Sequence, residues 1–159
     1  MRMIGITGGV GSGKSEVLSY LQEHYGGRAI EADRAGHLLM KKGGRCYRPI
    51  VELFGREVLD GEGELDRKKL GAIVFRHADL LEKLNRIVHP AVKNYILEET
   101  EKAREAGEKF VFLEAALLIE EKYDEICDEL WYVYAEEGVR RERLKRSRQY
   151  SDEKIRDMM

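Results

Sequence analysis

The fold of this chain is decided near its start, which reads MIGITGGVGSGKS from Met3 to Ser15. The run from Met3 to Thr7 is short, apolar and followed by two glycines, a pattern typical of a buried strand in a parallel sheet. Beyond Ser15, the spacing of Val17 and Leu21 predicts a helix with one apolar side. The stretch therefore predicts a strand, a glycine-rich loop and a helix in direct succession.

The loop matches the phosphate-binding pattern Gly-x-x-x-x-Gly-Lys-[Ser/Thr] in full. Glycines let successive backbone N–H groups curl toward phosphate oxygens, and the start of the next helix adds its positive dipole end. Lys14 places a charge against the outer phosphates, and the Ser15 hydroxyl is a suitable Mg²⁺ ligand. A dinucleotide site fits less well, because Lys14-Ser15 suits a triphosphate. The residues expected to bind ATP are Gly8, Gly9, Val10, Gly11, Ser12, Gly13, Lys14, Ser15 and Glu16.

Composition limits the class of protein. The chain has 159 residues, which fits one domain with a small insertion, and a formal net charge of -2, which argues against a general nucleic-acid binder. Cys46 and Cys127 lie far apart and outside any Cys-x-x-Cys pair, so we expect reduced thiols. No apolar stretch approaches the roughly 20 residues of a membrane helix. We expect a cytoplasmic protein with no membrane or nucleic-acid partner.

Three further β-rich runs resemble the first strand. They cover Ala29 to Ala32, Phe110 to Leu113 and Leu130 to Ala135, and we expect the last two to be central strands. The segment from His37 to Ile96 has helical apolar spacing, and His89-Pro90 predicts a helix boundary because proline disfavours helical geometry in the preceding residue. Strands that alternate with helices predict an α/β fold with a parallel sheet.

An acid stands at the end of the second predicted strand. Asp33 is suited to accept a proton from an attacking hydroxyl, or alternatively to cap the next helix. The helical segment could serve as an acceptor-binding insertion, and the C-terminal arginines could serve as a lid. Together with an acid at Asp33, these features favour a small-molecule kinase. A nucleotide-hydrolysing switch protein is the alternative from another class. However, Asp33-Arg-Ala-Gly36 comes too early for a GTPase Asp-x-x-Gly element, and no Asn-Lys-x-Asp element is present.

The chain resembles the dephospho-coenzyme A kinase family along essentially its whole length. The loop alone is generic, whereas the LDRKKL and LNRIVHP segments are far more selective. The matching segments are the loop with Ile4 to Thr7 before it, Ala32-Asp33 with His37, GELDRKKL from Gly63 to Leu70 with Val74-Phe75, LNRIVHP from Leu84 to Pro90, and EAALLIE from Glu114 to Glu120.

The resemblance implies transfer of a phosphate from ATP, with Mg²⁺, to the 3′-hydroxyl of the ribose of dephospho-coenzyme A. A kinase for another small molecule or nucleoside is the competing alternative. The implied fold is a three-layer P-loop NTPase fold with a parallel sheet, a helical substrate-binding insertion and a lid. We expect the nucleotide core at residues 1–36 and 91–135, the insertion at 37–90 and the lid at 136–159.

The resemblance also implies functional residues. Asp33 is implied as the general base, and the expected catalytic residues are Asp33 and Lys14. The candidate acceptor-binding residues are Asp33, His37, Arg67, His89 and Pro90. Each has a structural alternative: His37 simply packs, Arg67 pairs with Asp66 or another acid, and His89 ends a helix.

Several positions depart from the family pattern. Glu31 stands where the family has an aspartate, while Asp33 is kept. Glu16 replaces a hydroxyl residue, and we expect its side chain to face away from the phosphates while its backbone N–H serves one of them. Glu114, in place of an aspartate, is either a water-mediated Mg²⁺ ligand or a structural acid.

The C-terminal region is rich in arginine. Arg148 fits the family's lid arginine best, because it lies three residues before Ser151, and Arg143 is the next candidate. The other basic residues there are typical of a solvated helix face. The family continues beyond the lid, so we expect the C-terminal part of the fold to be missing from this sequence. We expect a monomer.

Overall fold

The chain divides into two compact units, and the computed structural model describes all of its residues, 1–159. Met1–Glu31 and Glu99–Met159 form one unit, which we call the sheet unit. Ala32–Glu98 form the other, which we call the helical unit. The helical unit begins five residues before and ends eight residues after the insertion expected at 37–90.

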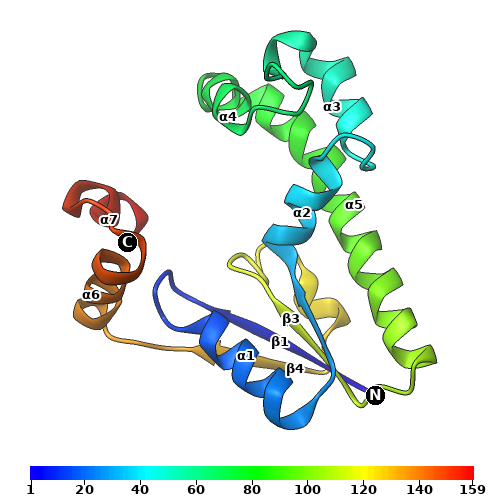
Figure 1. Cartoon of the computed structure of the whole chain (residues 1–159), viewed down its shortest axis with the longest axis vertical. Helices are drawn as coiled ribbons and strands as arrows, with labels where there is room; N and C mark the ends of the chain where they lie inside the picture. The colour runs from blue at the N-terminus through cyan, green and yellow to red at the C-terminus, as the bar shows by residue number, and fades with distance from the viewer. The chain divides into compact units, whose positions relative to one another are not determined.

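A four-stranded parallel sheet organises the sheet unit, in the order β2-β3-β1-β4 (Figure 1). Its strands are β1 (Arg2–Gly8), β2 (Arg28–Glu31), β3 (Phe110–Glu114) and β4 (Glu129–Val133). The α/β fold with a parallel sheet predicted from the sequence is therefore confirmed. Because β1 pairs on both sides and ends at Gly8, the glycine-rich loop opens at the carboxyl edge of the sheet, where α/β proteins bind ligands.

Helical segments cover both faces of this sheet. On one face, Ile4 and Ile6 of β1 pack against Leu18 of α1 (Lys14–Tyr25). On the other face, Met3 contacts Thr100 in the last part of α5 (Ala78–Glu105). Alternation along β1 thus sends successive side chains to opposite layers, which gives the three-layer arrangement.

The helical unit contains α2 (Ala32–Met40), α3 (Tyr47–Phe54), η1 (Arg56–Val58), α4 (Arg67–Arg76) and the first part of α5. The loop between η1 and α4 is closed by an antiparallel bridge between Leu59 and Leu65. Asp66 caps α4, since its carboxylate accepts the backbone N–H groups of Lys68 and Lys69. The buried apolar side chains of this unit include Ala35, Leu39, Cys46, Ile50, Phe54, Val58, Leu70, Val92 and Ile96.

The predicted helix boundary at His89-Pro90 is wrong. α5 runs without interruption through Pro90. A proline inside a helix removes one hydrogen bond and costs roughly 3 kcal/mol. Val92 and Ile96, both buried, lie beyond the proline, so continuing the helix buries apolar surface that offsets this cost.

The expectation of two central strands is correct for β3 and wrong for β4. β3 lies between β2 and β1, but β4 pairs only with β1 and forms an edge of the sheet. Its residues Leu130, Trp131 and Tyr132 are accordingly exposed. The chain then passes through α6 (Glu137–Arg148) and α7 (Asp152–Met158). None of the helices is long and apolar enough to cross a membrane.

Candidate active site

The glycine-rich loop adopts a backbone that side chains would obstruct. Gly8 has φ 153°, and a Cβ atom at this position would lie 2.3 Å from the carbonyl oxygen of Val133. Gly13 has φ 101°, in the left-handed region that glycine adopts at little cost. It forms the N-cap of α1 and provides no side chain to satisfy the first N–H groups of the helix. These N–H groups are therefore suited to an anion at the mouth of the loop.

Lys14 closes the loop from inside. Its Nζ atom donates to the carbonyl oxygens of Gly8, at 2.8 Å, and Gly9, at 3.2 Å. The positive charge is thus held at the loop itself, where phosphate would be bound. The Ser12 hydroxyl, also in the loop, is buried and has no hydrogen-bond partner. Such an unsatisfied polar atom is expensive in a core and common at binding sites.

Two arginines of α6 lie against the loop. Arg143 donates from Nη1 to the carbonyl oxygens of Ser12, at 3.0 Å, and Gly11, at 3.3 Å. The Nη1 atom of Arg140 lies 2.1 Å from the position that a Cβ atom on Gly9 would take. Arg140 and Arg143 are three residues apart and so share one helix face. The sequence analysis did not single out Arg140. Its position three residues before Arg143 is the sequence signal that could have found it.

Arg148 is not at the loop. Its guanidinium lies 6.0 Å from the centre of the Tyr150 ring, at the C-terminal end of α6. The structure therefore brings Arg143 to the loop, and Arg148 is held elsewhere. The role of either arginine as a lid residue stays a prediction.

Glu16 and Ser15 lie in the first turn of α1, and both are exposed. Glu16, with Val17 and Tyr20 of the same helix, is among the residues that line a pocket described below. Its Oε2 atom is 3.5 Å from the position of a Cβ atom on Gly13.

Hard oxygen donors suited to Mg²⁺ stand near the end of β1. Ser15 offers a hydroxyl, and Glu114 ends β3 in register with Ile6, two residues before the loop begins. No group of three or more His, Cys, Asp or Glu side chains could hold a metal ion. A hydroxyl and one carboxylate fit an ion that takes its other ligands from phosphates and water, as Mg²⁺ does.

Three predicted residues of the helical unit lie together. Asp33 and His37 are one turn apart on α2, and Arg67 is the first residue of α4. Arg67 Nη1 lies 3.4 Å from His37 Nδ1. Burial and the Arg67 charge lower the pKa of His37, and Asp33 acts in the opposite direction. The imidazole therefore contacts a cation and is also acted on by the charge of a nearby carboxylate.

His89 and Pro90 line an open hollow of about 530 Å³ on one side of α5. Asn85 and Arg86, one turn earlier, line it as well. Since Pro90 has no N–H, the Arg86 carbonyl loses the partner that an α-helix would give it. The residues that line the hollow thus include an asparagine, an arginine and a histidine beside apolar side chains.

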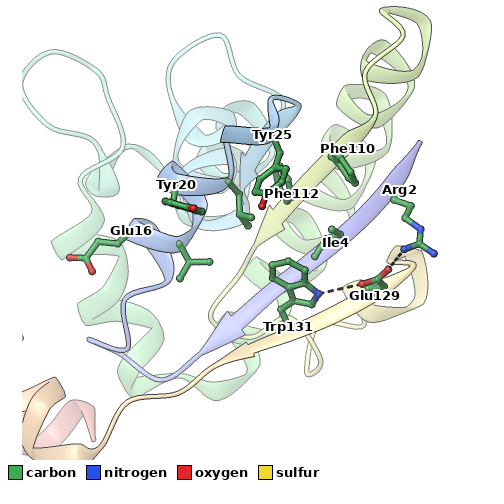
Figure 2. A pocket seen from close by; sticks show the side chains of 11 residues that line it. Arg2, Ile4, Glu16, Tyr20, Tyr25, Phe110, Phe112, Glu129 and Trp131 are labelled. Atoms are coloured by element: carbon green, nitrogen blue, oxygen red, sulfur yellow. Dashed lines mark hydrogen bonds and ion pairs between the residues drawn. The ribbon is translucent and has the colours of Figure 1, made fainter. Parts of the chain in front are cut away.

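A larger pocket of about 740 Å³ lies between α1 and the sheet (Figure 2). Arg2, Phe110 and Glu129, which begin three of the strands, line it together with aromatic side chains such as Trp131. Arg2 pairs with Glu129 in this pocket. The pocket lies mainly toward the amino ends of the strands, whereas the phosphate loop follows a carboxyl end. It is therefore separate from the loop.

Neither cysteine is arranged as a nucleophile. Both thiols are free, and Cys46 is buried. Burial raises the pKa of Cys46, and burial together with Asp124 and Asp128 raises the pKa of Cys127 to about 11. Both thiols therefore stay protonated at neutral pH, which excludes them from thiolate chemistry.

A model of the family described as Dephospho-CoA kinase matches residues 2–159, which covers both units. The chain belongs to the dephospho-CoA kinase family. A curated member from Staphylococcus epidermidis is 41% identical over 143 residues, which are 90% of this chain and 70% of that protein. Membership makes the chain a kinase, and the P-loop geometry agrees with this activity.

Solved structures extend the likeness to three dimensions. A crystal structure of a protein from Thermus thermophilus has 29% identity and a TM-score of 0.83, and the match covers 99% of this chain and 78% of that one. A dephospho-CoA kinase from Campylobacter jejuni has 22% identity and a TM-score of 0.65, with 98% and 77% covered. The second likeness supports the fold alone.

Proposed function

We propose that this protein transfers the γ-phosphoryl group of ATP to the 3′-hydroxyl of the ribose of dephospho-CoA. The observation that carries the proposal is the family match over residues 2–159, because it includes the helical unit as well as the generic phosphate loop. The proposal places the protein in the cytoplasm, as a monomer with no nucleic-acid or membrane partner. The formal net charge of -2 supports the absence of a nucleic-acid partner.

The nucleotide half of the reaction belongs to the sheet unit. Loop N–H groups and the start of α1 hold the β- and γ-phosphates, and Lys14 turns its ammonium from the loop carbonyls to phosphate oxygens. Arg140 and Arg143 neutralise charge on the transferred group. The buried Ser12 hydroxyl and Arg140 Nε, neither of which has a partner, support this assignment because phosphate oxygens would satisfy both.

Ser15, and Glu114 through water, are the residues that would hold Mg²⁺. The ion supplies neutralisation of charge on the β- and γ-phosphates.

The acceptor half of the reaction belongs to the helical unit. Asp33 takes the proton of the 3′-hydroxyl while the hydroxyl oxygen bonds to the γ-phosphorus. The bond from that phosphorus to the bridging oxygen breaks, and ADP leaves with the bonding electron pair. Positioning and electrostatics provide most of the rate in such transfers. Arg67, with His37 beside it, and the hollow at His89 and Pro90 bind other parts of the acceptor.

A product assay tests the activity. Purified protein, ATP, Mg²⁺ and a panel of acceptors that includes dephospho-CoA are incubated, and the products are identified by mass spectrometry. Phosphate on dephospho-CoA supports the proposal. Phosphate on a different acceptor would identify another small-molecule kinase, and release of inorganic phosphate alone would indicate a hydrolysing switch protein.

A substitution tests the base. Asp33→Asn should leave ATP binding intact and lower turnover by at least about a hundredfold, the scale of a lost general base. Asp79→Asn is the matched control, because Asp79 is an exposed aspartate in the first turn of α5. Near-normal turnover of the Asp33 variant would remove this residue from the mechanism.

A further inference from the structure

The side chain of Arg67 is presented by a tightly built loop. In this loop, the backbone N–H of Asp60 donates to Glu64 at 2.8 Å, and that of Asp66 donates to Val58 at 2.7 Å. The Tyr47 hydroxyl also donates to the Gly63 carbonyl. These bonds fix the backbone immediately before Arg67, so its Cα position is well determined.

Arg67 is not paired with the neighbouring acid. The Asp66 carboxylate accepts the backbone N–H groups of Lys68, at 3.0 Å, and Lys69, at 3.2 Å, and so serves as the cap of α4. The Arg67 guanidinium instead reaches His37 on α2. The alternative in which Arg67 pairs with Asp66 therefore does not occur.

The contact with His37 has a defined direction. A guanidinium has five N–H donors and no acceptor, so His37 Nδ1 accepts the bond and the imidazole proton lies on Nε2. Burial and the Arg67 charge both lower the pKa of His37, which keeps the imidazole neutral at neutral pH. Of the groups acting on His37, Asp33 alone has the opposite effect.

Most of the guanidinium is available for a ligand. Arg67 is exposed, and its bond to the neutral His37 uses one of its five N–H groups and none of its charge. A planar guanidinium with free N–H groups matches the oxygens of a phosphate. His37 lies one helical turn from Asp33 on α2, so the bond ties this cation to the helix that carries the proposed base.

We propose that Arg67, held in place by His37, is the subsite for the diphosphate of the acceptor. His37 is a positioning residue that acts through Arg67 and does not touch the reacting atoms. This inference rests on the proposed function, because dephospho-CoA carries a diphosphate between its ribose and its pantetheine arm. It goes further by assigning that group to one cation and by giving His37 a role.

Steady-state kinetics of five proteins test the subsite: wild type, His37→Leu, His37→Asn, Arg67→Ala and the double variant His37→Leu/Arg67→Ala. His37→Leu should raise the KM for dephospho-CoA about tenfold, the scale of one hydrogen bond to a charged group. The KM for ATP and the melting temperature should not change. His37→Asn should stay within about threefold of wild type, because the amide oxygen replaces Nδ1 as acceptor.

The double variant separates positioning from packing. If His37 acts through Arg67, the double variant should have the same KM for dephospho-CoA as Arg67→Ala alone. His77→Leu, an exposed histidine at the end of α4, is the matched control and should behave like wild type. A normal KM in His37→Leu, or additive effects in the double variant, would overturn the inference. If the wild type does not phosphorylate dephospho-CoA at all, the proposed function itself has failed.

Discussion

Arg140 is held against the phosphate loop at a cost to the free protein. Its Nε atom is buried without a hydrogen-bond partner. A buried donor left unsatisfied costs about 1–3 kcal/mol. Its Nη1 atom occupies space that only a glycine at position 9 leaves open, since a Cβ atom there would lie 2.1 Å away. The guanidinium is therefore placed for a phosphate oxygen, and without one it is strained.

Arg140→Ala should have opposite effects on stability and activity. Removal of the unsatisfied donor gains about 1–3 kcal/mol, and lost packing of the methylene stem offsets about 1–2 kcal/mol of this gain. For a chain of this size, about 1 kcal/mol corresponds to about 2–4 °C in melting temperature. The middle of each range leaves a net gain of about 0.5 kcal/mol, so we expect the nucleotide-free variant to melt about 1–2 °C above the wild type. Its turnover should fall about 100- to 1000-fold, as when one donor to developing charge is lost.

Thermal melting with and without ATP, together with turnover, tests this reasoning. ATP should raise the melting temperature of the variant less than that of the wild type, because ligand stabilisation follows affinity. Arg146→Ala is the matched control and should change turnover less than about threefold, since that exposed side chain of α6 pairs only with Glu142 on its own helix. If Arg140→Ala melts more than about 4 °C lower and keeps its turnover, the arginine is structural and the reasoning is refuted.

Two further predictions concern Lys14 and Cys127. Lys14→Ala should lose most activity and ATP binding, because the Lys14 ammonium also holds the carbonyls of Gly8 and Gly9 in place. A variant that stays active in a kinase assay would contradict the phosphate-loop assignment. Cys127 should resist alkylation in the native protein at pH 8 and react once unfolded, because burial raises its pKa from 9.0 to about 11. The folded state keeps a proton that the unfolded chain releases, so the stabilisation from Cys127 is present below pH 9 and lost as pH approaches 11. Rapid native alkylation at pH 8, followed by mass spectrometry, would show that the thiol is not protected.

The local patterns of this sequence predicted the first strand, the phosphate loop and the start of α1 correctly. The apolar run before Gly8 and the glycine spacing after it specify a strand and a loop through backbone sterics, which depend little on distant residues.

The rest depended on packing that a local pattern does not contain. Pro90 carried a valid local signal, but Leu84, Val88, Val92 and Ile96 recur every four residues across it, and this longer pattern agrees with the continuous helix. The position of β4 at the edge follows from strand order, which its composition cannot encode. Likewise, the direction in which α6 leaves β4 decides which arginine reaches the loop. A count of residues back from Ser151 does not contain this direction, and it selected Arg148, which lies near Tyr150 instead.

The exposed edge of β4 has a practical consequence for handling this protein. One side of the strand has no partner, and Trp131 and Tyr132 beside it are exposed. An unprotected edge with aromatic side chains is a template on which other chains add as strands, which begins aggregation. Within residues 1–159, this edge is therefore the position at which a further strand would pair, and a charged substitution at Tyr132 should weaken that pairing.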